Sequence, residues 1–236
     1  MRKRTSISRF GVVCVTVVSA LACLPGCAIP VVPSRVVLED PANFVRLELD
    51  SRVIPEEPDT SHDHPATVAP ELMADILRGL SVRDHRLALY VWAFGLAPTE
   101  LAFSEAEIQL VAAKLSEGLA DATPTECVTF YLSYPQTSVK REITSGSLYI
   151  KTGYLHFTLS NHREIYGIPA YGMIYDRRYP RLPIAPKDFD VLFALPAAVV
   201  PQDASLWETI RGLEHDSVVI DLGKLNPANS VVQALP

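Results

Sequence analysis

A polar stretch near residue 60 holds side chains that could bind a metal ion. His62, Asp63 and His64 are consecutive, and further acidic residues lie upstream at 56–59. Imidazole nitrogens and carboxylate oxygens are ligands for zinc and other divalent ions. The pattern supplies only two histidines, and a solvated acidic loop would account for it equally well. We therefore assign no metal and no cofactor, and keep His62 and His64 as the candidates to locate.

Covalent catalysis would need a nucleophile with a base beside it. Cys127, in the strand-like stretch TECVTFYLS, is the only cysteine beyond residue 27, and the sequence favours a small side chain packed in a strand. The motifs G-x-S-x-G and H-E-x-x-H and the P-loop are absent. Because triads assemble in space rather than in sequence, a hydrolase built from scattered His, Asp and Ser stays open. We assign no catalytic residue.

The stretch 166–186, YGIPAYGMIYDRRYPRLPIAP, favours recognition over catalysis. Tyr and Arg are the side chains that most often anchor protein interfaces, and proline lowers the cost of ordering a segment on binding. The candidate partner-binding residues are Tyr171, Tyr175, Arg177, Arg178 and Tyr179. The alternative is a long loop folded back over its own core, with the tyrosine rings buried.

The N-terminus has the pattern of a secretory signal. Arg2, Lys3 and Arg4 open the chain, and residues 10–24 are almost wholly apolar. A spanning helix needs about 20 apolar residues. A basic start followed by a shorter apolar run therefore predicts a signal peptide over 1–26.

The residues Leu24-Pro25-Gly26-Cys27 resemble the lipobox of bacterial lipoproteins. The resemblance implies that the Cys27 thiol receives a diacylglycerol, that the chain is cut before it, and that a fatty acid such as palmitate acylates the new amino group. Residues 27–35 would then be the lipidated cysteine and a short tether. Ala28 favours the outer membrane, facing the periplasm, with the inner membrane or the cell surface as alternatives. An ordinary signal peptide with an incidental cysteine also remains open.

Charge argues against some partners. Removing residues 1–26 takes away four basic side chains and no acidic one, so the formal charge changes from −6 to −10. Nucleic acids and anionic lipid headgroups require clustered Lys and Arg. We therefore expect no nucleic-acid partner, and membrane contact through the lipid on Cys27.

Apolar periodicity predicts the elements of the remainder. The alternation of Val45, Leu47 and Leu49 with charged residues predicts a strand with one wet face. A helix is expected from Pro70, and a second from Ser104, where SEAE has the form of a capping box. The apolar run 87–96 indicates a buried strand, with a helix as the alternative. A hairpin is expected over 141–165, and a loop over 54–69.

The stretch GSLYIKTGYLHF resembles the central hairpin of GRAM and bacterial PH-like domains, through Gly146, Leu148, Tyr149, Ile150 and the pair Leu155 and Phe157. The resemblance implies a small curved sheet and carries no expectation of lipid binding.

These patterns predict an α+β protein. Residues 36–236 should form a single periplasmic domain, a largely antiparallel sheet of about seven strands with two or three packed helices. We expect a lipid-anchored envelope protein that binds a partner protein, as a scaffold or assembly factor, rather than an enzyme. A periplasmic hydrolase and a carrier of an apolar ligand are the alternatives. A scaffold should expose an aromatic patch, an enzyme should gather His and carboxylates in a cleft, and a carrier should enclose an apolar cavity.

Overall fold

The fold is α+β, as the sequence predicts. The structure, a computed structural model, describes residues 33–86, 88–167, 180–185, 188–201 and 216–225. These ranges form a six-stranded antiparallel sheet, a three-stranded antiparallel sheet and three α-helices. The nine described strands exceed the expected seven or so, because a small second sheet joins the large one. No helix in the described ranges is long and apolar enough to cross a membrane.

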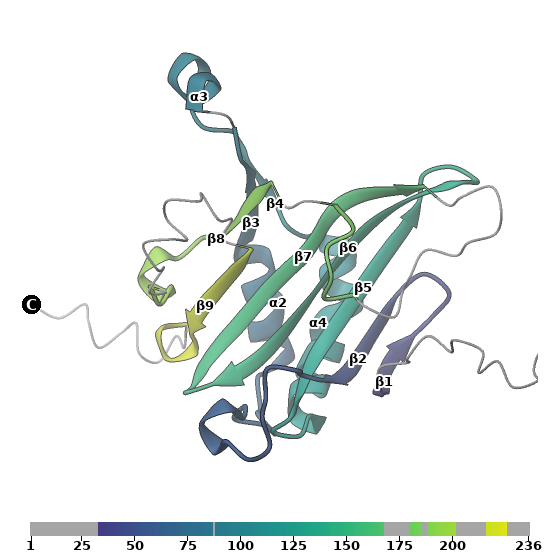
Figure 1. The fold of residues 1–236 in the computed structure, drawn as a ribbon, viewed down its shortest axis with the longest axis vertical. Helices are drawn as coiled ribbons and strands as arrows, with labels where there is room; N and C mark the ends of the chain where they lie inside the picture. The colour runs from purple at the N-terminus through teal and green to yellow at the C-terminus, as the bar shows by residue number, and fades with distance from the viewer. Residues whose placement is uncertain (1–32, 87, 168–179, 186–187, 202–215, 226–236) are drawn as a thin grey trace, which may run out of the picture. The chain divides into compact units, whose positions relative to one another are not determined.

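The large sheet has the order β1-β2-β5-β6-β7-β9, and every neighbouring pair is antiparallel (Figure 1). Its strands are β1 Ser34–Glu39, β2 Phe44–Leu49, β5 Glu126–Pro135, β6 Lys140–Lys151, β7 Tyr154–Gly167 and β9 Ser217–Asp221. The predicted hairpin is confirmed as β6 and β7. Thr152 and Gly153 form its turn with φ values of 51° and 76°, the left-handed conformation that a two-residue hairpin turn requires.

Two helices cover one face of the large sheet, α2 (Pro70–Gly79) and α4 (Glu105–Asp121) (Figure 1). The capping box of α4 is confirmed: the Glu107 amide donates to Ser104 Oγ, and the Ser104 amide donates to Glu107 Oε2. Leu115 from α4 is fully buried in the same apolar core as Leu47 and Val128 from the sheet. The helical spacing of the apolar residues thus places one side of each helix in the core against the sheet.

The small sheet has the order β4-β3-β8, with β3 Leu80–Asp84, β4 Thr99–Leu101 and β8 Phe189–Phe193. The connection from β3 to β4 carries the short helix α3, Ala88–Phe94. The expectation of a buried strand over 87–96 is wrong for the described residues, because the chain there is helical and its large apolar side chains are exposed. Gly95, at φ 78°, closes the helix by donating its amide to the Val91 carbonyl.

The second face of the large sheet carries many polar side chains beside a small apolar cluster of Phe44, Tyr131 and Ile143, and much of it is buried. Glu48 and Asp50 were expected on a wet face of β2 but are 2% and 3% exposed, while Leu49 between them is half-exposed. Val45 and Leu47 lie in the apolar core, so the predicted alternation holds for these residues, but the polar face is not wet and Leu49 is not in the core. Part of the cover is the described segment 180–185. Ser145 Oγ donates to the Pro180 carbonyl and Ser160 Oγ to the Arg181 carbonyl.

Candidate functional site

The loop 54–69 is confirmed, with the short 3-10 helix Pro58–Thr60 as its only regular element, but its histidines are not solvated. Backbone hydrogen bonds hold the loop against the rest of the protein: the amide of His62 donates to Pro124 and that of Asp63 to Ile150. His62 and His64 are consequently buried, at 5% and 6% exposure. The upstream acidic side chains at 56–59 stay exposed and do not join them.

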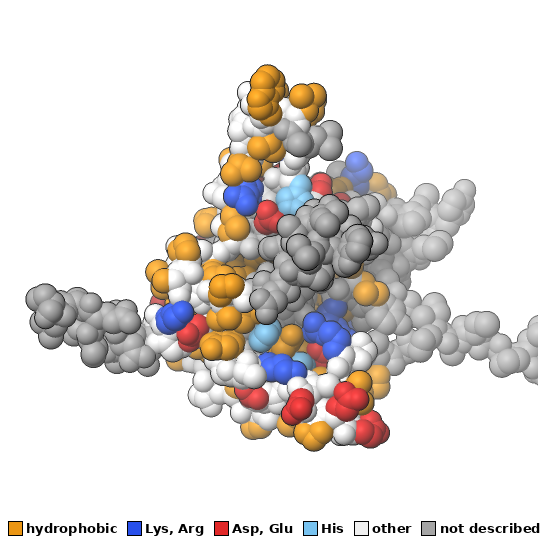
Figure 2. Space-filling view, turned by 60° about the vertical axis from the view of Figure 1, so that its left-hand side comes forward, with side chains coloured by type: hydrophobic (Ala, Val, Ile, Leu, Met, Phe, Trp, Pro, Cys, Tyr) orange, Lys and Arg blue, Asp and Glu red, His pale blue; other side chains and the backbone are white. Residues whose placement is uncertain are grey.

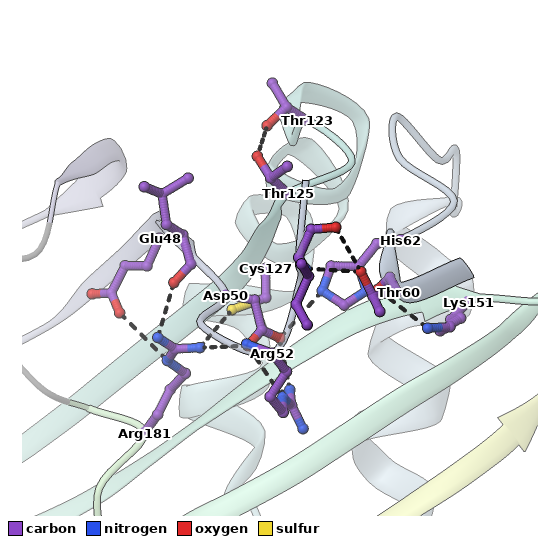
Figure 3. A network of polar contacts seen from close by, with 12 residues as sticks. Glu48, Asp50, Arg52, Thr60, His62, Thr123, Thr125, Cys127, Lys151 and Arg181 are labelled. Carbon is purple, nitrogen blue, oxygen red and sulfur yellow. Dashed lines mark hydrogen bonds and ion pairs between the residues drawn. The ribbon is translucent and has the colours of Figure 1, made fainter. Parts of the chain in front are cut away.

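The buried carboxylate of Asp50 is the centre of a polar cluster (Figure 3). Arg52 donates to it from Nε and Nη2, with Nη2 at 2.8 Å from Oδ2, and its own amide donates to Oδ1. His62 Nε2 lies 3.2 Å from Oδ2. Burial alone would raise the pKa of Asp50, but the hydrogen bonds from His62 and Arg52 outweigh it and hold the pKa far below its usual value. Asp50 is therefore a fixed negative charge.

Arg181 ties the segment 180–185 to this cluster. Its Nη1 lies 3.3 Å from Asp50 Oδ1, its Nη2 donates to the Leu49 carbonyl at 3.0 Å, and its Nε lies 3.8 Å from Glu48 Oε2 (Figure 3). Burial raises the pKa of Glu48, and the charge of Arg181 opposes that rise. One guanidinium thus helps to neutralise two buried carboxylates at the end of β2.

Stacked rings close the cluster on the side of the β6–β7 hairpin. The His62 ring stacks on Tyr149 at 4.1 Å between centroids, and Tyr149 stacks on His156 at 4.7 Å. Burial raises the pKa of Tyr149 and lowers that of His156, so at neutral pH both rings are uncharged. Of these rings, His62 contacts the Asp50 carboxylate directly.

The chemistry of this cluster suits a structural role better than catalysis. Cys127 is fully buried, and burial raises the pKa of its thiol to about 12, with Arg181 opposing the rise only in part. A nucleophilic cysteine needs the opposite, a lowered pKa and access to solvent. Within the described residues, no three His, Cys, Asp or Glu side chains are grouped so that they could hold a metal ion. The cluster joins β2, the loop 54–69 and Arg181.

The exposed surface of α3 and the residues after it is the most unusual feature of the described residues. Leu89, Tyr90, Trp92, Phe94 and Leu96 form what we call the apolar tip. Trp92 is 85% exposed, Phe94 73% and Leu89 72%. Figure 2 shows these apolar side chains gathered at the end of the β3–β4 connection. Single exposed apolar residues are ordinary, but a contiguous group marks a contact with a partner or a membrane.

One ion pair and two hydrogen bonds hold the foot of this connection, where β3 pairs with β8. Arg83 Nη2 lies 3.2 Å from Asp190 Oδ2, His85 Nε2 lies 2.7 Å from Asp190 Oδ1, and the His85 amide donates to the Asp188 carbonyl. Arg83 and Asp190 are also a register pair of β3 and β8. The apolar tip therefore extends from a framework that is itself well bonded.

The remaining sequence-predicted residues fall outside the described ranges. Cys27 and the rest of the signal and lipobox lie in 1–32, and Tyr171, Tyr175, Arg177, Arg178 and Tyr179 lie in 168–179. Residues 166 and 167 of the predicted loop 166–186 belong to β7, which ends at Gly167. Sequence reasoning missed the apolar tip as a surface, although the ten-residue apolar run was its signal. It also missed Arg52 and Arg181, for which the sequence offers no local signal.

Comparison with models of protein families, with curated proteins and with solved structures found no match for this chain.

Proposed function

We propose that this protein is a lipid-anchored component of the bacterial cell envelope, held at the outer membrane through Cys27 and facing the periplasm, which acts by binding another envelope component through its apolar tip. The anchor rests on the resemblance of Leu24 to Cys27 to a lipobox. The binding role rests on one observation, the exposure of five large apolar side chains from Leu89 to Leu96.

An exposed aromatic surface is what distinguishes a binding protein from the two alternatives. The polar cluster around Asp50 is closed, with its carboxylate paired and its thiol protonated at neutral pH, so it supports neither acid–base nor nucleophilic work. The apolar tip, by contrast, leaves large side chains in water at a cost of about 1.5–3 kcal/mol each relative to full burial. A binding partner would recover part of that free energy.

The anchor is tested by metabolic labelling with a fatty acid. The wild-type chain should take up label, and Cys27→Ser should take up none and remain uncleaved. Equal labelling of the two chains, or labelling of neither, would show that Cys27 is not acylated.

The binding surface is tested by site-specific crosslinking in cells. A photoreactive amino acid replaces Trp92 in one strain and Val36 in another, because Val36 is an exposed apolar residue on β1, away from the apolar tip. We expect adducts with an envelope component at position 92 and few at position 36. The proposal fails if the two positions give the same adducts, or if position 92 gives no adduct with either a protein or a lipid.

A further inference from the structure

The apolar tip is apolar around most of its circumference. Successive helical residues are about 100° apart, so Leu89 and Trp92 lie on one side of α3 and Tyr90 and Phe94 on another. All four are exposed, and only Val91 between them is half-buried. A helix that docks in a protein groove presents one apolar stripe and keeps a polar face for water. This helix has no polar face, which favours an apolar medium that surrounds it.

Charge is absent from the part of the connection that carries the apolar tip. No charged residue occurs between Arg86 and Glu100. In sequence, Arg83 and Arg86 precede the apolar residues and Glu100 follows them, and Figure 2 shows basic and acidic side chains below the apolar end. Trp and Tyr, which the apolar tip contains, are the residues enriched where a bilayer meets water. A charged foot below an uncharged aromatic end matches the polarity profile of a lipid monolayer.

The length of α3 limits how deeply the apolar tip could enter a bilayer. Seven helical residues are about 10 Å long, far too short to span a bilayer but comparable to the 5–10 Å to which interfacial helices are buried. The lipid anchor would also hold the folded part of the chain close to the membrane. Cys27 lies seven residues before Ser34, the start of β1, so the connecting chain reaches at most about 25 Å. A lipid on Cys27 would keep the described residues within reach of the membrane surface.

From these observations we propose that the apolar tip inserts into one leaflet of a lipid bilayer and gives the protein a second membrane contact beside Cys27. This inference rests on the proposed function and names the component that the apolar tip binds. The foot carries charges of both signs, so the contact depends on the hydrocarbon and not on anionic headgroups. Uncharged lipid suffices.

Trp92 reports directly on insertion. The chain has two tryptophans, Trp92 and Trp207, so Trp207→Phe leaves Trp92 as the only one. The purified full chain is mixed with phosphatidylcholine vesicles whose acyl chains are either ordinary or brominated, since bromine quenches only a ring that reaches the hydrocarbon. We expect a blue-shifted emission, and at least a twofold loss of Trp92 fluorescence in the brominated vesicles. Adding phosphatidylglycerol should leave the loss unchanged.

Two controls separate insertion from other effects. Trp92→Phe, with Trp207 kept, measures the quenching of Trp207 alone, and its difference from wild type gives the Trp92 signal even if Trp207→Phe folds poorly. Leu89→Glu combined with Phe94→Glu should abolish the quenching of Trp92. Leu195→Glu adds charge at an exposed leucine outside the apolar tip and should retain it.

The outcomes distinguish this inference from the function on which it rests. Equal Trp92 emission in ordinary and brominated vesicles overturns insertion. If crosslinking at position 92 still captures an envelope protein, the apolar tip serves a protein partner, and the proposed function stands without the bilayer. If emission instead shifts with protein concentration alone, the apolar tip binds a second copy of this chain. Absence of quenching and of crosslinks removes both proposals.

Discussion

Acidification should destabilise the fold through His64. The ring is buried beside His62, and burial first, then the neighbouring His62, lowers its pKa from 6.5 to about 4. In the unfolded chain the pKa returns to about 6.5. Between these two values the unfolded chain binds more protons than the folded one, so stability falls as the pH falls. The contribution of the neutral His64 ring to the free energy of unfolding is complete above pH 6.5 and is lost below pH 4.

The pKa difference of about 2.5 corresponds to about 3 kcal/mol in total, of which about 2.5 kcal/mol should be gone by pH 4.5. Urea unfolding at pH 7.5 and pH 4.5 measures the loss for wild type and for His64→Leu. Other groups titrate in the same window, since His156 and His162 also have pKa values lowered by burial. The comparison of the two chains isolates His64, because those groups are common to both.

The expected result is that His64→Leu loses about 2.5 kcal/mol less than wild type between the two pH values. The argument depends on burial of the ring in the folded state. Equal losses in the two chains would show that His64 titrates in the folded protein as it does in the unfolded chain, and would refute the placement of this loop.

Three further predictions concern the core and the polar cluster. Leu115→Ala should lower the free energy of unfolding by roughly 2–5 kcal/mol, and the neighbouring half-exposed Lys114→Ala by at most about 0.5 kcal/mol; equal effects in denaturant melts would mean that the core side of α4 is misassigned. Arg181→Met should cost about 1–3 kcal/mol, because Asp50 loses a charged donor, and an unchanged melting temperature would contradict the bridging role. Alkylation of Cys127, followed by mass spectrometry, should be slow in the native protein and rapid in denaturant, whereas rapid native labelling would show an accessible thiol.

Local patterns in the sequence predict much of this fold. Pro70 at the start of α2 and the capping box at Ser104 lie where a helix begins, and Thr152 with Gly153 lies where a hairpin turns. These signals are local because the backbone groups that they satisfy lie within a few residues. The α+β class follows from them.

Whether each face of the sheet is buried or exposed to solvent could not be predicted from such local patterns. The alternation in β2 gives the side of the sheet on which Glu48 and Asp50 lie, but Arg181, which helps to bury them, is more than 130 residues away in sequence. Such pairing is decided by tertiary structure. The prediction of a buried strand over 87–96 was wrong for a related reason. Hydrophobicity indicates a preference for an apolar environment, but it does not say whether the protein's own core provides that environment.

The apolar tip lies in a connection between two strands that pair with each other. The residues that stabilise the fold are therefore different from the residues that the proposed contact needs. Arg83 is the register partner of Thr99, so β3 and β4 are already side by side where the connection leaves them. A two-residue turn could close the same hairpin without any change in the sheets. Over evolutionary time this segment can therefore lengthen, shorten or exchange its side chains at little risk to the rest of the molecule. Descendants of one ancestral scaffold could differ in what they touch while keeping an identical core.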